Sequence, residues 1–93
     1  MMENAAPVQV WLVERMFAED KSNLIVLVYA TTDGQRYTMK EHAITGNAET
    51  RRTTAAVEVD PDDLDPVGDE TLQNQYATEA TRMANVHDPD DPI

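Results

Sequence analysis

Residues 24–40 carry the feature that most constrains the fold, which is the signature of a β-hairpin. Residues 24–32 are a strongly β-prone run, Asp33-Gly34 is a residue pair typical of a two-residue type I′ turn, and residues 35–40 alternate again. Such a turn fixes the register of the two strands. The expected cross-strand pairs are Thr32–Gln35, Ala30–Tyr37, Val28–Met39 and Leu27–Lys40.

This register gives the hairpin two faces of different character. One face is apolar throughout, and we expect it to be the core side; its residues are Leu24, Val26, Val28, Ala30, Tyr37 and Met39. The other face mixes apolar residues with a basic border; its residues are Ile25, Leu27, Tyr29, Arg36, Thr38, Lys40 and His42. The sequence therefore predicts that the mixed face is the outer one.

The rest of the chain predicts further strands and one helix. Residues 8–17 and 53–59 are rich in β-branched and aromatic side chains, whereas residues 41–52 are ambiguous. From Asp69 as N-cap to His87, apolar residues recur at three- and four-residue spacing, as in an amphipathic helix. The predicted fold class is α+β, an antiparallel β-meander of three to four strands with one C-terminal amphipathic helix packed on one face.

A chain of 93 residues has room for one small core, so we expect a single domain over residues 1–93. Its predicted parts are a β-sheet part (8–59), an acidic connector (60–68), the helix (69–87) and a flexible acidic tail (88–93). The longest apolar run is too short to span a membrane, and no Lys or Arg precedes Arg15 as a signal peptide would require. We expect a soluble, cytoplasmic protein without membrane contact.

The charge is distributed unevenly along the chain. The sequence has 18 acidic and 7 basic residues and a formal net charge of -11. Residues 58–93 contain eleven acids and one base, which gives this part a net charge of -10 and leaves -1 for residues 1–57. Mutual repulsion among these carboxylates is strong in dilute buffer and screened in concentrated salt.

Two segments resemble a known group of proteins. Tyr29-Ala30-Thr31-Thr32-Asp33-Gly34-Gln35-Arg36-Tyr37 and Tyr76-Ala77-Thr78-Glu79-Ala80-Thr81-Arg82-Met83 are similar to segments of small, acidic, uncharacterised proteins of halophilic archaea. The resemblance implies a salt-rich cytoplasm as the setting of this protein. It implies no activity, because both segments are structural, a hairpin and a helix face.

The residues offer little material for catalysis or for a metal site. The chain has no cysteine, one serine and no glycine-rich phosphate loop. The acidic run from Asp60 to Asp65 fails the EF-hand spacing, and His87 has no second histidine near it. We therefore expect a noncatalytic protein with no cofactor and no metal.

Two surfaces remain as candidates for binding. The first is a protein interface, for self-association as a homodimer or for another protein, on the outer sheet face; its residues are Trp11, Val13, Phe17, Ile25, Leu27 and Tyr29. The alternative is a regulatory or nucleic-acid-associated factor with a basic patch of Arg36, Lys40, Arg51 and Arg52. A net charge of -11 opposes binding of nucleic acid, so the protein interface is the favoured hypothesis.

Overall fold

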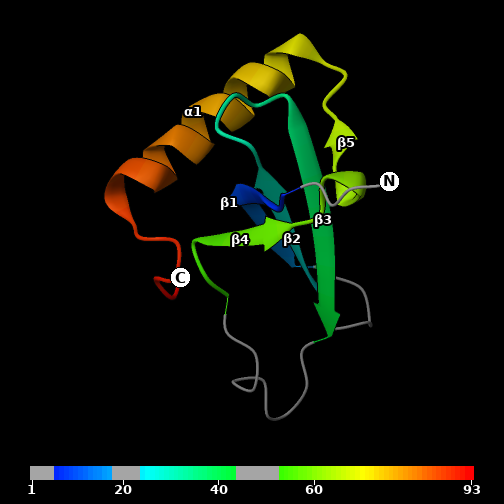
Figure 1. The fold of residues 1–93 in the computed structure, drawn as a ribbon. Coiled ribbons are helices and arrows are strands. Elements are labelled where there is room, and N and C mark those ends of the chain that lie inside the picture. Colours follow the sequence, from blue (N-terminus) through cyan, green and yellow to red (C-terminus); the bar gives the residue numbers. More distant parts are fainter. Residues whose placement is uncertain (1–5, 18–23, 44–52) are drawn as a thin grey trace.

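The computed structural model describes residues 6–17, 24–43 and 53–93. Along the chain it has the strands β1, β2 and β3, then β4, the short 3-10 turn η2, the strand β5 and the helix α1 (Figure 1). Their bounds are Val8–Phe17, Leu24–Ala30, Arg36–Ala43, Ala56–Val59, Pro61–Asp63, Asp65–Pro66 and Glu70–Val86. The strands form one antiparallel sheet in the order β4-β1-β2-β3-β5. The predicted α+β meander with one C-terminal helix is confirmed, with two-residue β5 as an additional strand.

The hairpin of β2 and β3 has the predicted register. The pairs Ala30–Tyr37, Val28–Met39 and Leu27–Lys40 are all present. The turn, however, is not the predicted two-residue type I′ turn. The amide of Gly34 donates to the Thr31 carbonyl at 2.9 Å, and the amide of Thr31 donates to the Arg36 carbonyl at 3.1 Å, so residues 32–35 form a longer loop.

Side-chain hydrogen bonds explain this longer loop. The carboxylate of Asp33 accepts from the Thr31 hydroxyl at 2.6 Å and from the Gln35 amide at 3.0 Å. Short polar side chains often compete in this way with the backbone pattern of a turn. Of the pair Asp33-Gly34, Gly34 is the residue with a left-handed backbone, with φ of 74°.

A register shift in β1 determines which of its residues share a face. Trp11 pairs with Ala30 and Leu12 with Tyr29, but Glu14 pairs with Val28, so Val13 is an extra residue in a β-bulge. Trp11 therefore lies on the same side of the sheet as Val28 and Tyr37. We call this side, which carries Trp11, Val28, Ala30, Tyr37 and Met39, the helix side, because the ring of Tyr37 lies 6.4 Å from that of Tyr76 in α1.

The opposite side of the sheet is covered by the link between β4 and β5. These strands lie at opposite edges of the sheet, so the chain from Asp60 to Leu64 has to cross one of its faces; in Figure 1 it leads from the end of β4 to the side of β3 where β5 lies. Leu64 belongs to the same buried cluster as Val10, Leu27 and Tyr29. We call Asp60–Leu64 the strap, and the side with Val10, Leu12, Leu27 and Tyr29 the strap side.

The core is therefore not where the hairpin pattern predicted it. Leu27 and Tyr29 of the predicted outer face are 0% and 2% exposed, whereas Met39 of the predicted core face is 51% exposed. Val28 and Ala30 of that face are buried as predicted. The physical reason is that Leu64 of the strap joins the buried cluster that contains Leu27 and Tyr29, whereas Met39 on the helix side stays exposed.

The helix lies across one end of the sheet, next to the β2–β3 turn. Its N-cap is Asp69 and its C-cap is His87, as predicted, and the Asp69 carboxylate accepts from the Leu72 amide at 2.9 Å. Ala80 and Met83 of the predicted stripe are buried. The Thr81 hydroxyl donates to the carbonyl of Thr32 at 3.3 Å, which joins the helix to the turn.

The predicted flexible tail is held by backbone hydrogen bonds. The amides of Ala55 and Ala56 donate to the carbonyls of Asp91 and Pro89 at 2.9 and 3.0 Å, and the amide of Ile93 donates to the Thr53 carbonyl at 2.9 Å. Residues 89–93 therefore lie antiparallel to residues 53–56. The tail thus provides acceptors for backbone amides beside β4, which would otherwise have to form hydrogen bonds with water.

Candidate interaction surface

The protein interface predicted from the sequence lies largely inside the molecule. Three of its six residues are buried, namely Leu27, Tyr29 and Trp11; Val13 and Ile25 are half-buried; and Phe17 is 64% exposed. The six also do not share a face, because the pairing with Ala30 places Trp11 on the helix side while Leu27 lies on the strap side. As a correction, Leu27, Tyr29 and Trp11 belong to the core of this chain and offer no surface to a partner.

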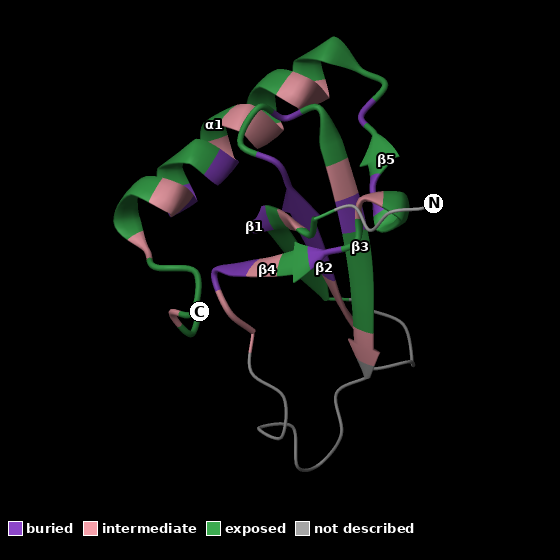
Figure 2. Cartoon of the chain, viewed as in Figure 1, coloured by how far each residue is buried: buried purple, intermediate pink, exposed green. Residues whose placement is uncertain are grey.

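The helix side of the sheet has an apolar surface that α1 leaves open. Met16 is 41% exposed and Met39 is 51% exposed, and Val26 between them is half-buried. Met16 pairs with Val26 across β1 and β2, and Met39 pairs with Val28 across β2 and β3. We call Met16, Val26 and Met39 the open patch; in Figure 2 the part of β3 far from the helix is largely green, which marks exposed residues.

Two carboxylates flank the open patch. Glu41 pairs with Val26, which puts it in one row with Met16, and Glu14 pairs with Val28, which puts it in one row with Met39. Both glutamates are exposed. The open patch is thus an apolar surface with a negative charge at two of its corners.

The tyrosine pair closes the patch at the end next to the helix. Tyr37 and Tyr76 are half-buried, with ring planes inclined by 50°. Burial raises the pKa of Tyr76, and the nearby Glu14 carboxylate and Tyr37 raise it further. The Tyr76 hydroxyl is therefore neutral at physiological pH, and the two rings form an amphipathic border of the patch.

One edge of the sheet is also open beside this patch. β2 pairs with β3 from Tyr37 to Ala43, but β5 pairs only with Arg36 and Tyr37 on the other side. Among the described residues, no strand pairs with residues 38–43 on that outer side. We call residues 38–43 the open edge; it places Met39 and Glu41 on the helix side and Lys40 and His42 on the strap side.

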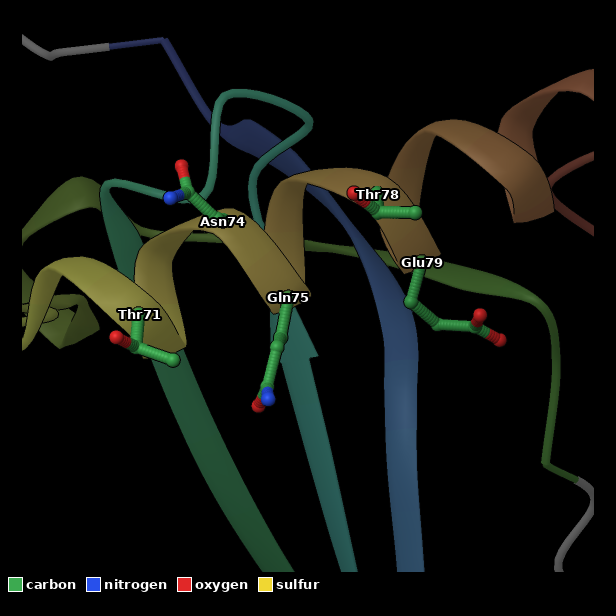
Figure 3. Close-up of a pocket in the computed structure, with 5 residues that line it drawn as sticks. All are labelled: Thr71, Asn74, Gln75, Thr78 and Glu79. Atoms are coloured by element: carbon green, nitrogen blue, oxygen red, sulfur yellow. The ribbon is translucent and has the colours of Figure 1, made fainter.

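A depression also lies along α1, but its lining offers little charge for binding a ligand. It has a volume of about 410 Å³ and is lined by Thr71, Asn74, Gln75, Thr78 and Glu79 (Figure 3). All five come from one helix, so no second element closes the depression. Glu79, the one charged residue among them, forms an ion pair with Arg82 at 2.6 Å, and this hydrogen-bonded contact lowers its pKa.

The basic patch predicted from the sequence is only half described. Arg36 and Lys40 are exposed residues of β3, separated by the buried Thr38, whereas Arg51 and Arg52 lie outside the described residues. The two described cations therefore do not by themselves form a continuous basic surface. The nucleic-acid alternative remains a prediction from the sequence.

Asp60 is an acidic residue of the connector with a structural role. Asp60 accepts from the Asp62 amide at 2.9 Å and caps η2, as Asp69 caps α1. In the described ranges no three His, Cys, Asp or Glu side chains are grouped so that they could hold a metal ion. Sequence reasoning found the cap at Asp69, but it missed the open patch and the open edge. The alternation of Met39 and Glu41 was the available signal for the patch.

Comparison with known proteins places the chain in one family. The model of a family of unknown function (DUF7967) matches residues 3–93. No curated protein matches the chain, and no solved structure matches it. None of the described helices is long and apolar enough to cross a membrane.

Proposed function

We propose, from the surface of this chain, which belongs to the family of unknown function, that it is a noncatalytic protein-interaction module. It would bind another protein through the open patch. The observation that carries the proposal is the exposure of Met16 (41%) and Met39 (51%) on one side of the sheet. Methionine side chains are flexible and polarizable, so they adapt to a partner surface at little steric cost. Such residues are enriched at the core of protein interfaces.

We also propose that the protein works in a salt-rich cytoplasm. Residues 58–93 contain eleven acids and one base, so most of their carboxylates have no cation of the same segment to pair with. At molar salt the Debye length is about 3 Å, compared with about 10 Å at 0.1 M, so repulsion among these carboxylates is then strongly weakened. Screening also lets an acidic surface approach a partner of any charge, which leaves apolar contact as the main attraction.

Site-specific photocrosslinking tests the proposal in the cells that make the protein. A benzophenone amino acid replaces Met39 in one variant and Val86, a 57% exposed residue of α1, in the other. We expect a defined crosslinked protein from position 39 and none from position 86. Equal crosslinking from both positions, or none from either, would contradict the proposal.

Met16 and Phe17 provide a matched pair of substitutions. They are neighbours in β1 and both exposed, but Met16 lies on the helix side and Phe17 on the strap side. Met16→Glu should reduce the yield of the position-39 crosslink about tenfold, while Phe17→Glu should leave it unchanged. If Phe17→Glu had the larger effect, the partner would bind the strap side instead.

A further inference from the structure

We propose that the open edge of β3 binds an extended segment of the partner protein as an additional strand of the sheet. This inference rests on the proposed function and names the binding mode and the chemistry of the partner. β3 is eight residues long, but only Arg36 and Tyr37 have a strand partner on the outer side among the described residues. The open edge therefore presents backbone N–H and C=O groups in the spacing that an added strand satisfies.

The open edge and the open patch meet at Met39. This residue belongs to the edge strand, and its side chain lies on the helix side in the same row as Val28. An added strand would place its own side chains next to Met39 at ordinary cross-strand distance, about 4.5–5.5 Å between Cβ atoms. Strand addition would thus cover the most exposed residue of the patch, and the patch explains why one side of the added strand should be apolar.

A second copy of this chain is poorly suited to pair with the open edge. In a twofold dimer the two β3 strands are antiparallel, and residues that face each other must lie on the same side of the sheet. The two registers that use most of residues 38–43 are centred on Lys40 or on Glu41. Each places a like charge opposite itself, Lys40 against Lys40 or Glu41 against Glu41, which destabilises a pair of strands.

A different protein avoids this conflict if its strand carries the complementary pattern. Opposite Met39 it needs an apolar side chain, opposite Lys40 an acid, and opposite Glu41 a base. In an antiparallel strand these three follow one another as base, acid and apolar residue. Lys40 and Glu41 are both exposed, so each can form an ion pair with the oppositely charged side chain of an added strand. We infer that the partner segment is an extended peptide with this alternation.

The test uses the full chain and two synthetic peptides of equal composition. The matched peptide is Val-Thr-Arg-Asp-Ile-Thr and the control is Val-Thr-Asp-Arg-Ile-Thr, in which acid and base are exchanged. We expect the matched peptide to bind about fivefold more tightly at 0.1 M salt, since each cross-strand ion pair contributes modestly. The double variant Lys40→Glu/Glu41→Lys should reverse this preference, and molar salt should weaken the preference between contacting charges without abolishing either it or the binding.

Hydrogen exchange identifies where the matched peptide binds. The amides of residues 38–43 should gain protection, while those of α1 should not. If the peptides bind without protecting these amides, or if neither peptide binds, the edge is not the site and the inference is overturned. A crosslink from position 39 to another protein would in that case leave the proposed function standing. A crosslink to a second copy of the chain would overturn the inference as well.

Discussion

Gly34 sits where the turn between β2 and β3 meets the helix, and replacing it with alanine should strongly destabilise the protein. Its φ of 74° lies in the left-handed region, which costs a residue with a Cβ about 1–2 kcal/mol. A Cβ at this position would overlap the carbonyl oxygen of Gln73 and lie 2.9 Å from the Ala77 amide nitrogen and 3.0 Å from its Cβ. Because two of these atoms belong to the helix backbone, the helix itself has to shift.

Forced overpacking of this kind costs about 1–3 kcal/mol. Together with the backbone strain, Gly34→Ala should lower the free energy of unfolding by about 2–5 kcal/mol, against a total of about 5–14 kcal/mol for a domain of this length. Urea unfolding followed by far-UV circular dichroism and by Trp11 fluorescence measures the loss. Both signals should change together, since Trp11 of the sheet and Ala80 and Met83 of the helix share one buried cluster and should unfold as one unit.

Gly68→Ala is the matched control for this experiment. Nothing lies within 4 Å of a Cβ at Gly68, so this substitution should be neutral or slightly stabilising. Gly34→Asn separates the two causes, because asparagine tolerates the left-handed region but has a larger side chain. Asn at position 34 should be at least as destabilising as Ala. If Gly34→Ala and Gly68→Ala differed by less than about 0.5 kcal/mol, the close approach of turn and helix would be refuted.

Two further predictions concern the turn and the tail. Hydrogen bonds from the Thr31 hydroxyl and then the Gln35 amide hold the pKa of Asp33 below its ordinary 3.8, so this carboxylate stabilises the fold above that pH and ceases to do so as the pH falls through the lowered pKa. Asp33→Asn should therefore be less stable than wild type at pH 7, and the difference should vanish in acid; a constant difference would contradict the role of the charge. Deleting residues 88–93 should speed hydrogen exchange at the Ala55 and Ala56 amides and leave β2 and β3 unchanged, whereas unchanged exchange at Ala55 would show that the tail does not protect it.

The parts of the fold that the sequence predicted depend on local signals. The register of β2 and β3 follows from the alternation of short segments on either side of one turn, and the pairs Val28–Met39 and Leu27–Lys40 are as expected. The helix is equally local, since Asp69 caps its start and His87 precedes Pro89 at its end. Even the turn was placed correctly, although Thr31 and Asp33 side chains changed its internal geometry.

The parts that could not be predicted depend on contacts between distant segments. β2 is apolar on both faces, so the sequence of the hairpin alone does not say which face is buried. The burial of the strap side depends on Leu64, a single apolar residue within an acidic segment. Leu64 belongs to the same buried cluster as Leu27 and Tyr29. The candidate surface changed for the same reason, because burial of Leu27 removed one surface and partial cover by α1 left Met39 exposed.

The strap affects the stage of synthesis at which this chain can complete its core. Charge divides the protein near residue 57 into a nearly neutral part and a part with a net charge of -10, and that boundary would be a natural place to cut a fragment. Leu27 and Tyr29, however, stay uncovered until residue 64 has been made and has crossed the sheet. We therefore expect that residues 1–57 do not fold by themselves and that the acidic part completes the core of a nascent chain.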